Sequence, residues 1–266
     1  MSHDPITKYG LTAVPAAAGA AIDASPAPST GPSVIPVSET AMPTTALARR
    51  THAYAQKYLP VPTYNHSMRV YHYGLAMKQY RFANAPEWAF TDETYFLASL
   101  LHDIGLTGEN LRATKLSFEF YGGYLALDVL RQRNGDGDDN AEAETKVEAV
   151  APRDQAESIA EAIIRHQDLC DEGTITALGQ LLQMATLFDN IGSHKELVHP
   201  DTIADVTKHF PRLNWSHCFT ETVRKEVSLK PWAHSTALGM EAFPTRVLGN
   251  TLMAPYESGG LSGLSE

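Results

Sequence analysis

Histidines and aspartates in this sequence end stretches that are otherwise apolar, and these residue types can bind a divalent metal. His102 and Asp103 follow an apolar run that ends at Leu101. A carboxylate buried there would lose several kcal/mol of hydration unless hydrogen-bond donors or a cation compensate it. For this doublet alone, a hydrogen-bonded core histidine beside a helix-end aspartate is the simpler interpretation.

Asp189 ends a second apolar stripe. Leu178, Leu182 and Ala185 precede it, and the four residues are spaced so that they share one helical face. A carboxylate in the last turn of a helix is unfavourable, because the helix dipole there favours a cation. A nearby metal ion or arginine would remove that objection.

His166 ends a third stripe, and His66 lies at the start of another predicted helix. Each of them alone is explained as well by an ordinary core or surface histidine. Together, however, separate helices deliver two histidines and two aspartates in the order His, His-Asp, Asp, with His166 before the last aspartate. Such a set suits a divalent metal that accepts mixed nitrogen and oxygen ligands.

The segments that carry these residues show helical periodicity, so we expect an all-α domain. Apolar residues recur at three- and four-residue spacing over residues 44–58, 65–80, 92–104, 115–131, 154–167 and 176–190. Pro60 and Pro62 separate the first two helices, and Gly105 is a candidate helix stop. Gly122 and Gly123 each cost about 1 kcal/mol relative to alanine within a helix, which indicates close contact with another helix.

The two ends of the chain differ from the middle in composition. Residues 1–45, rich in Ala, Pro, Ser and Thr, predict a flexible arm, residues 46–250 the helical domain, and residues 251–266 a flexible tail. The acidic stretch 134–148 lacks the pattern of an EF-hand calcium loop, because Ala141 and Val147 stand where glycine and glutamate are required. We interpret it as a solvated loop between helices.

Composition excludes several classes of function. The chain has 266 residues, of which 43% are hydrophobic, and a formal net charge of −10, so it can form a core but has no basic surface for nucleic acid. No stretch approaches the roughly 20 apolar residues of a membrane helix, and no secretory signal is visible. Cys170 and Cys218 provide neither a disulfide framework nor a metal-ligand spacing. We expect a cytoplasmic protein that binds neither nucleic acid nor membranes, and that forms a homo-oligomer.

Longer strings of the sequence resemble a known family. They are Asn65–Val70, Leu100–Ile104, Arg112–Lys115, Ser117–Gly123, Ala162–Leu169, Leu187–Gly192, Phe210–Leu213 and Lys230–Trp232. These strings resemble the fungal cyanamide hydratases, which lie within the HD-domain superfamily of metal-dependent hydrolases. The resemblance covers residues 38–250 and implies a multi-helical HD-domain bundle.

The resemblance also implies a ligand set and a reaction. One zinc ion per chain would be bound by His66, His102, Asp103 and Asp189, and Fe²⁺, Mn²⁺ or Co²⁺ could occupy such a site as well. The substrate would be cyanamide and the product urea, which suggests a role in detoxification.

Hydration of a nitrile-like carbon needs a hydroxide at neutral pH and a proton for the nitrogen. Because zinc lowers the pKa of its water from about 16 to about 7, attack by zinc-bound hydroxide is expected. His166 is our first candidate for proton transfer, since imidazole titrates near neutral pH. Glu119 is the second candidate, and Lys115 lies four residues before it on the same predicted helix.

Two other functions compete with this prediction. An HD-type phosphohydrolase acting on a nucleotide or another small phosphate ester would need cations around the metal. The candidates for that role are Arg69, Arg112, Lys115 and Arg165. A degenerate HD-like binding module would have lost a ligand, whereas all four implied ligands are present.

Overall fold

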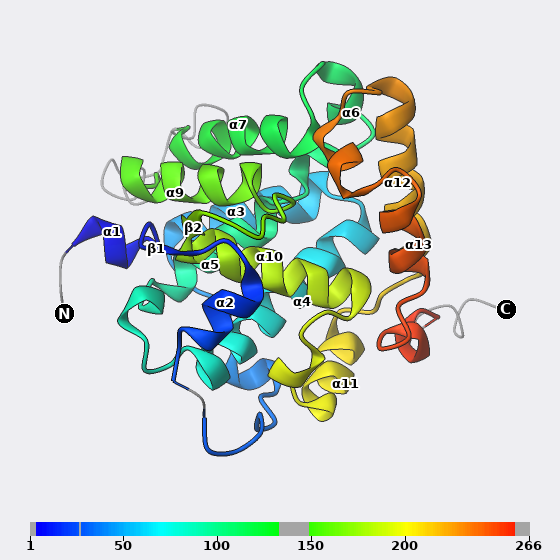
Figure 1. Ribbon diagram of the computed structural model, residues 1–266. Coiled ribbons are helices and arrows are strands. Elements are labelled where there is room, and N and C mark those ends of the chain that lie inside the picture. The colour runs from blue at the N-terminus through cyan, green and yellow to red at the C-terminus, as the bar shows by residue number, and fades with distance from the viewer. Residues whose placement is uncertain (1–3, 27, 133–148, 259–266) are drawn as a thin grey trace, which may run out of the picture.

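The computed structural model describes residues 4–26, 28–132 and 149–258, and its architecture is helical, which confirms the all-α prediction (Figure 1). Helices α4 (Val61–Arg81) and α10 (Ala177–Ile191) lie at the centre, and α7 (Phe118–Arg131) and α9 (Arg153–Ile164) lie side by side along one edge. The other helices are α1 (Pro5–Lys8), α2 (Ala18–Asp23), α3 (Ala46–Tyr58), α5 (Asp92–Leu101), α6 (Asn110–Ala113), α11 (Pro200–His209), α12 (Trp215–Leu229) and α13 (Ala242–Leu248). None of the described helices is both long and apolar enough to cross a bilayer.

Helix α4 is buried on every side from Asn65 to Met77. It begins at Val61, earlier than the sequence predicts, because Pro62 lies in the first turn. The missing N–H of proline costs nothing at that position, so the residue starts this helix instead of ending the previous one. His66 therefore lies inside the buried part of the helix.

Helix α5 ends before the His-Asp doublet. Its last residue is Leu101, so His102 and Asp103 lie in the turn that leads to a short 3-10 helix, η3 (Ile104–Leu106). Gly105 lies within η3, where a Cβ atom would be 2.1 Å from the carbonyl oxygen of Phe118. The glycine thus allows the start of α7 to approach the turn that carries the doublet.

The predicted close contact at Gly122 and Gly123 is confirmed. A Cβ atom on Gly123 would lie 2.5 Å from Cγ1 of Ile164, and one on Gly122 would lie 3.4 Å from Cγ2 of Ile163. Helices α7 and α9 therefore pack backbone to side chain at this point. The close packing also sets the position of His166, which lies two residues beyond the end of α9.

Residues 4–26 pack against the helical domain, which corrects the expectation of a flexible arm. Strand β1 (Ala13–Pro15) pairs antiparallel with β2 (Thr174–Thr176), and the segment crosses the front of the molecule next to α10 in Figure 1. Val14 and Ala21 are buried. Small apolar residues cannot form a core of their own, but they can complete one that the domain provides.

The described part of the predicted tail is packed as well, which corrects that expectation for residues 251–258. Met253 is buried, and the carboxylate of Glu257 accepts a hydrogen bond from Arg212. The predicted solvated loop, residues 134–148, and residues 259–266 lie outside the described residues.

Candidate metal centre

Three predicted ligands converge between α4 and the turn after α5. Nε2 of His66 lies 3.2 Å from Nε2 of His102. Oδ2 of Asp103 lies 3.7 Å from the first nitrogen and 3.3 Å from the second. All three side chains are buried, and the group has the composition and spacing of a metal site. Two imidazoles and a carboxylate are ligands suited to a divalent transition metal.

The hydrogen bonds of three histidines direct Nε2 toward this centre. In each ring Nδ1 lies beside an oxygen acceptor: Asp189 Oδ2 for His66 (2.6 Å), the Ser99 carbonyl for His102 (2.8 Å) and the Ile163 carbonyl for His166 (2.6 Å). Since a carbonyl only accepts, Nδ1 carries the proton and Nε2 is left with a free lone pair. This is the tautomer that binds a metal through Nε2.

Burial sets the charge of the His66 and His166 imidazoles. It lowers the pKa of His66 to about 4 and also lowers the pKa of His166, so both rings are neutral at pH 7. For His102 burial also acts to lower the pKa, but the negative charges of Asp103 and Asp189 and the hydrogen bond to the Ser99 carbonyl together outweigh it and raise the pKa. The Nε2 atoms of His66 and His102 lie 3.2 Å apart, so a proton or a metal cation between them is needed to keep their lone pairs from repelling each other.

Asp103 is the least compensated carboxylate of the site. Its side chain is 1% exposed, and neither of its oxygens has a hydrogen-bond partner among the described residues. Burial would raise its pKa, but the charges of His102 and the other nearby imidazoles lower it to about 2, so the group stays ionised. A buried charge without hydrogen bonds is costly, and a bound cation removes that cost. The residues present therefore fit a divalent metal.

His166 lies beside the same carboxylate. Its Nε2 is 3.9 Å from Oδ1 of Asp103, and its ring stands edge-on to that of His102, with the ring centroids 5.3 Å apart. His166 thus approaches Asp103 from α9, whereas His66 approaches it from α4.

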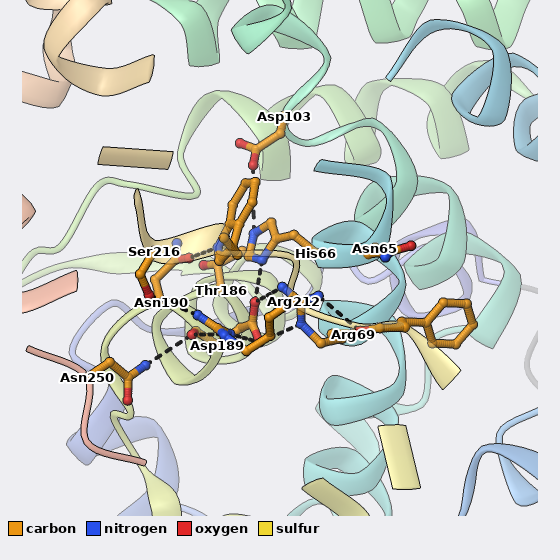
Figure 2. Close-up of polar contacts among 12 residues, drawn as sticks. Asn65, His66, Arg69, Asp103, Thr186, Asp189, Asn190, Arg212, Ser216 and Asn250 are labelled. Carbon is orange, nitrogen blue, oxygen red and sulfur yellow. Dashed lines mark hydrogen bonds and ion pairs between the residues drawn. The ribbon is translucent and has the colours of Figure 1, made fainter. Parts of the chain in front are cut away.

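Asp189 lies on the opposite side of the His66 ring from Asp103 (Figure 2). It accepts two hydrogen bonds from Arg69 (2.9 and 2.8 Å), one from Arg212 (2.7 Å) and one from His66 Nδ1 (2.6 Å). Burial would raise its pKa, but Arg212 and Arg69 hold the pKa well below the usual range. The structure therefore brings three of the predicted ligands together and places Asp189 behind one of them.

A small cavity opens beside His102, Asp103 and His166. The space open to the centre of a water molecule is about 10 Å³, close to the roughly 10–15 Å³ that one bound water needs. Its other lining residues are Gln167, Leu169, Thr186, Leu187, Asn190, Phe219, Leu238 and Phe243. Gln167 Oε1 is buried and has no hydrogen-bond partner in the described part of the chain.

Sequence reasoning missed Gln167, Thr186, Asn190 and the aromatic residue Trp215. Trp215 stacks on the His66 ring with the centroids 4.2 Å apart and donates from Nε1 to Asn190 Oδ1. Their positions could have indicated three of these residues. Gln167 directly follows His166, and Thr186 and Asn190 lie within one helical turn of Asp189. Trp215 had no comparable signal, because it comes from a distant helix.

Glu119 and Lys115 lie outside the lining of the cavity. Glu119 is buried, and its Oε1 lies 3.2 Å from Nδ1 of His234, while its Oε2 has no hydrogen-bond partner among residues 4–26, 28–132 and 149–258. Lys115 is exposed and precedes α7, so the two residues do not share a helix as the sequence predicts.

Known proteins similar to this chain include two from Saccharomyces cerevisiae. No protein-family model matches the chain. The two yeast proteins, named cyanamide hydratase DDI2 and cyanamide hydratase DDI3, are each 40% identical to it over 246 residues. The aligned region covers 92% of this chain and 98% of each relative, so it includes every residue of the candidate metal centre. This similarity confirms the resemblance seen in the sequence, and the chain belongs to the fungal cyanamide hydratase family.

Proposed function

We propose that this protein is a metal-dependent cyanamide hydratase that adds water to the nitrile carbon of cyanamide and forms urea. Its family membership supports this reaction. The observation that carries the proposal is that three imidazole Nε2 atoms surround a buried carboxylate, that of Asp103, beside a very small cavity, and that this carboxylate accepts no hydrogen bond from a described residue. An HD-domain fold and a cytoplasmic homo-oligomer stay predictions.

The ligands that we propose are His66, His102, Asp103 and His166. His166 takes the place that the sequence prediction gave to Asp189, whose oxygens are already occupied by Arg69, Arg212 and His66. Zinc suits this set of nitrogen and oxygen ligands, as do Fe²⁺, Mn²⁺ and Co²⁺. When bound, such an ion supplies a nucleophile at neutral pH, because it lowers the pKa of water from about 16 to about 7.

The residues around the cavity would hold and orient the substrate. Gln167 Oε1 receives no hydrogen bond from any described residue, so it can accept one from the amino group of cyanamide. Thr186 donates its hydroxyl proton to the carbonyl of Gln183 (2.9 Å), which leaves the oxygen as a further acceptor. Phe219, Leu238 and Phe243 form an apolar wall that limits the size of the substrate and excludes bulk water.

Proton transfer has two candidates. If His166 is a ligand, it cannot also exchange protons at Nε2, and Glu119 becomes the remaining candidate of the two predicted from the sequence. Two observations support this role for Glu119. Its Oε2 has no hydrogen-bond partner among the described residues, and its Oε1 bonds to His234, which is one-quarter exposed and so connects the carboxylate to solvent. No observation supports a part for Lys115.

The phosphohydrolase alternative lacks support at the cavity. Among the described residues that line it, none is a lysine or an arginine. Arg69 is engaged by Asp189, and Arg165 pairs with Asp168 at 3.0 Å.

Urea release from cyanamide by the zinc-loaded protein tests the proposal, with a panel of phosphate esters assayed in parallel and metal content measured on the same sample. We expect urea formation, one metal per chain and no phosphate release. His102→Ala should remove both metal and activity, whereas His209→Ala, at an exposed histidine of α11, should keep both. Phosphate release without urea would overturn the proposal.

A further inference from the structure

A buried series of ion pairs joins the C-terminal segment to the His66 imidazole (Figure 2 shows its inner part). His66 Nδ1 donates to Asp189 Oδ2, and Arg212 Nη1 donates to Asp189 Oδ1 at 2.7 Å. Arg212 Nε in turn donates to Glu257 Oε1 at 2.9 Å. The side chains of His66, Asp189 and Arg212 are fully buried, and that of Glu257 is 22% exposed.

Glu257 is itself held in place. The hydroxyl of Ser216 donates to Glu257 Oε1, and the backbone N–H of Asn214 donates to the Glu257 carbonyl at 2.9 Å. Arg212 Nη2 also donates to Ser216 Oγ at 3.2 Å, which closes a ring of three side chains. These contacts hold the carboxylate of Glu257 beside the guanidinium group of Arg212.

Within the ion pairs formed by Arg69, Asp189, Arg212 and Glu257, the carboxylate of Glu257 balances the charges. Arg69 and Arg212 bring two positive charges, and Asp189 supplies one negative charge. Glu257 supplies the second negative charge and shares Arg212 with Asp189. Without Glu257, Arg212 would bind Asp189 alone, and the excess positive charge would weaken Asp189 as an acceptor for the His66 N–H.

We propose that Arg212 and Glu257 are positioning residues for the metal ligand His66. They fix the position and charge of Asp189, and Asp189 fixes the tautomer and orientation of the imidazole. Partners behind a metal-binding histidine are worth about 10- to 100-fold in metal affinity when they are lost. The inference rests on the proposed metal site, and it assigns a function to a segment that the sequence predicts to be a flexible tail.

Zinc affinity of the full-length protein, measured by competition with a chromophoric chelator after the metal has been removed, tests this role. We expect Arg212→Lys to weaken zinc binding by about 10-fold or more, and Glu257→Gln by a smaller factor of about 3 to 10. Glu257→Asp should recover part of the affinity that Glu257→Gln loses. Glu241→Gln is the matched control, because Glu241 pairs with exposed Arg224 at 3.1 Å and should leave the affinity unchanged.

The melting temperature of each metal-free variant is measured beside the affinity. Unchanged zinc affinity in Glu257→Gln would overturn the proposal, whether or not the melting temperature falls, because it would make the ion pair purely structural. If Glu257→Gln fails to fold, Ser216→Ala, which removes only the hydroxyl that holds Glu257, provides the same comparison. The zinc titration needs no cyanamide, so the two proposals can fail separately. A protein that binds zinc but makes no urea would contradict the proposed function, while the zinc affinities of the variants would still decide the role of Arg212 and Glu257.

Discussion

Two buried aspartates face the His66 imidazole from opposite sides, and their surroundings differ completely (Figure 2). Among the residues that the structure describes, none donates a hydrogen bond to Asp103, whereas Asp189 accepts hydrogen bonds from His66, Arg69 and Arg212. Burial is the same for both, so burial does not separate the two roles. The difference in partners does separate them. Asp103 has oxygens free to bind a cation, whereas the oxygens of Asp189 are occupied and hold the neighbouring side chains in position.

Removing the partnerless carboxylate should have the largest effect. We expect Asp103→Asn to lose metal and urea formation as completely as His102→Ala, because an amide oxygen is a much weaker ligand than a carboxylate. The metal-free form of Asp103→Asn should melt only slightly below the parent, because the variant loses the attraction of the nearby imidazoles that lowers the pKa of Asp103, but no hydrogen bond to a described residue.

Metal analysis, a urea assay and thermal melting of the metal-free sample check this combination. Asp201→Asn, at a position 75% exposed, is the control and should change none of the three. A clearly lower melting temperature in metal-free Asp103→Asn would mean that the carboxylate is an anchor like Asp189.

Replacing His166 tests whether this residue binds the metal together with Asp103. If His166 joins Asp103 at the metal, His166→Ala should bind much less metal than the parent, and this is our expectation. If the residue only transfers protons, metal content should be retained and turnover should fall by about 10²- to 10⁴-fold. An ordinary core histidine would lower the melting temperature and leave turnover per folded molecule near the parental value, so the three measurements on one preparation distinguish all three roles.

Asp189→Asn should have the reverse profile of Asp103→Asn. Arg69 and Arg212 are both buried and would lose their shared carboxylate, which costs about 3–5 kcal/mol in the stability of the metal-free protein. Metal affinity should fall by about 10- to 100-fold, because His66 keeps its lone pair but loses its orienting partner.

Chemical denaturation of the metal-free protein and a zinc titration test these two values. Complete loss of metal with unchanged stability would return Asp189 to the ligand set that the sequence predicts. Arg69→Lys provides a comparison that keeps the charge while removing the paired hydrogen bonds.

Much of this arrangement could be predicted from the sequence, and the limits have physical reasons. The stripe that ends at Asp189 required either a metal or an arginine, and the structure supplies Arg69 and Arg212. One sequence cannot decide between them, because Arg212 lies beyond the end of the helix that carries Asp189 and reaches it only through the fold. His66 and the His102–Asp103 doublet were predictable, since their neighbours along the chain are already core residues.

The packing of residues 4–26 and 251–258 was not predicted, for a different reason. Composition shows that a segment cannot build its own core, but it does not show whether the segment completes another one. Val14 is held in place because β1 pairs with β2, and Glu257 is held in place because its carboxylate accepts a hydrogen bond from Arg212. Both contacts are between residues far apart in the sequence, so no local pattern reveals them.

The smallest expected effect is a loss of folding stability at acidic pH, which we attribute to a buried imidazole and not to the two aspartates. The pKa of Asp103 is lowered to about 2 and that of Asp189 lies well below its usual range, so neither aspartate takes up a proton above pH 4. His72, which lies on α4 away from the site and bonds through Nδ1 to Thr40 (2.6 Å), has its pKa lowered by burial to about 4. Between pH 6.5 and pH 4 the unfolded chain therefore binds a proton at His72 that the folded chain does not.

Stability from neutral His72 is thus fully present above pH 6.5 and declines as the pH falls toward 4, by up to about 3 kcal/mol. His72→Gln removes this titration, so the difference in unfolding free energy between parent and variant should shrink by about that amount over the interval. Urea denaturation of metal-free protein at pH 7, 5.5 and 4.5 measures it. A difference that stays constant with pH would place the acid sensitivity elsewhere, with His66 and His166 as the next candidates because burial lowers their pKa values too.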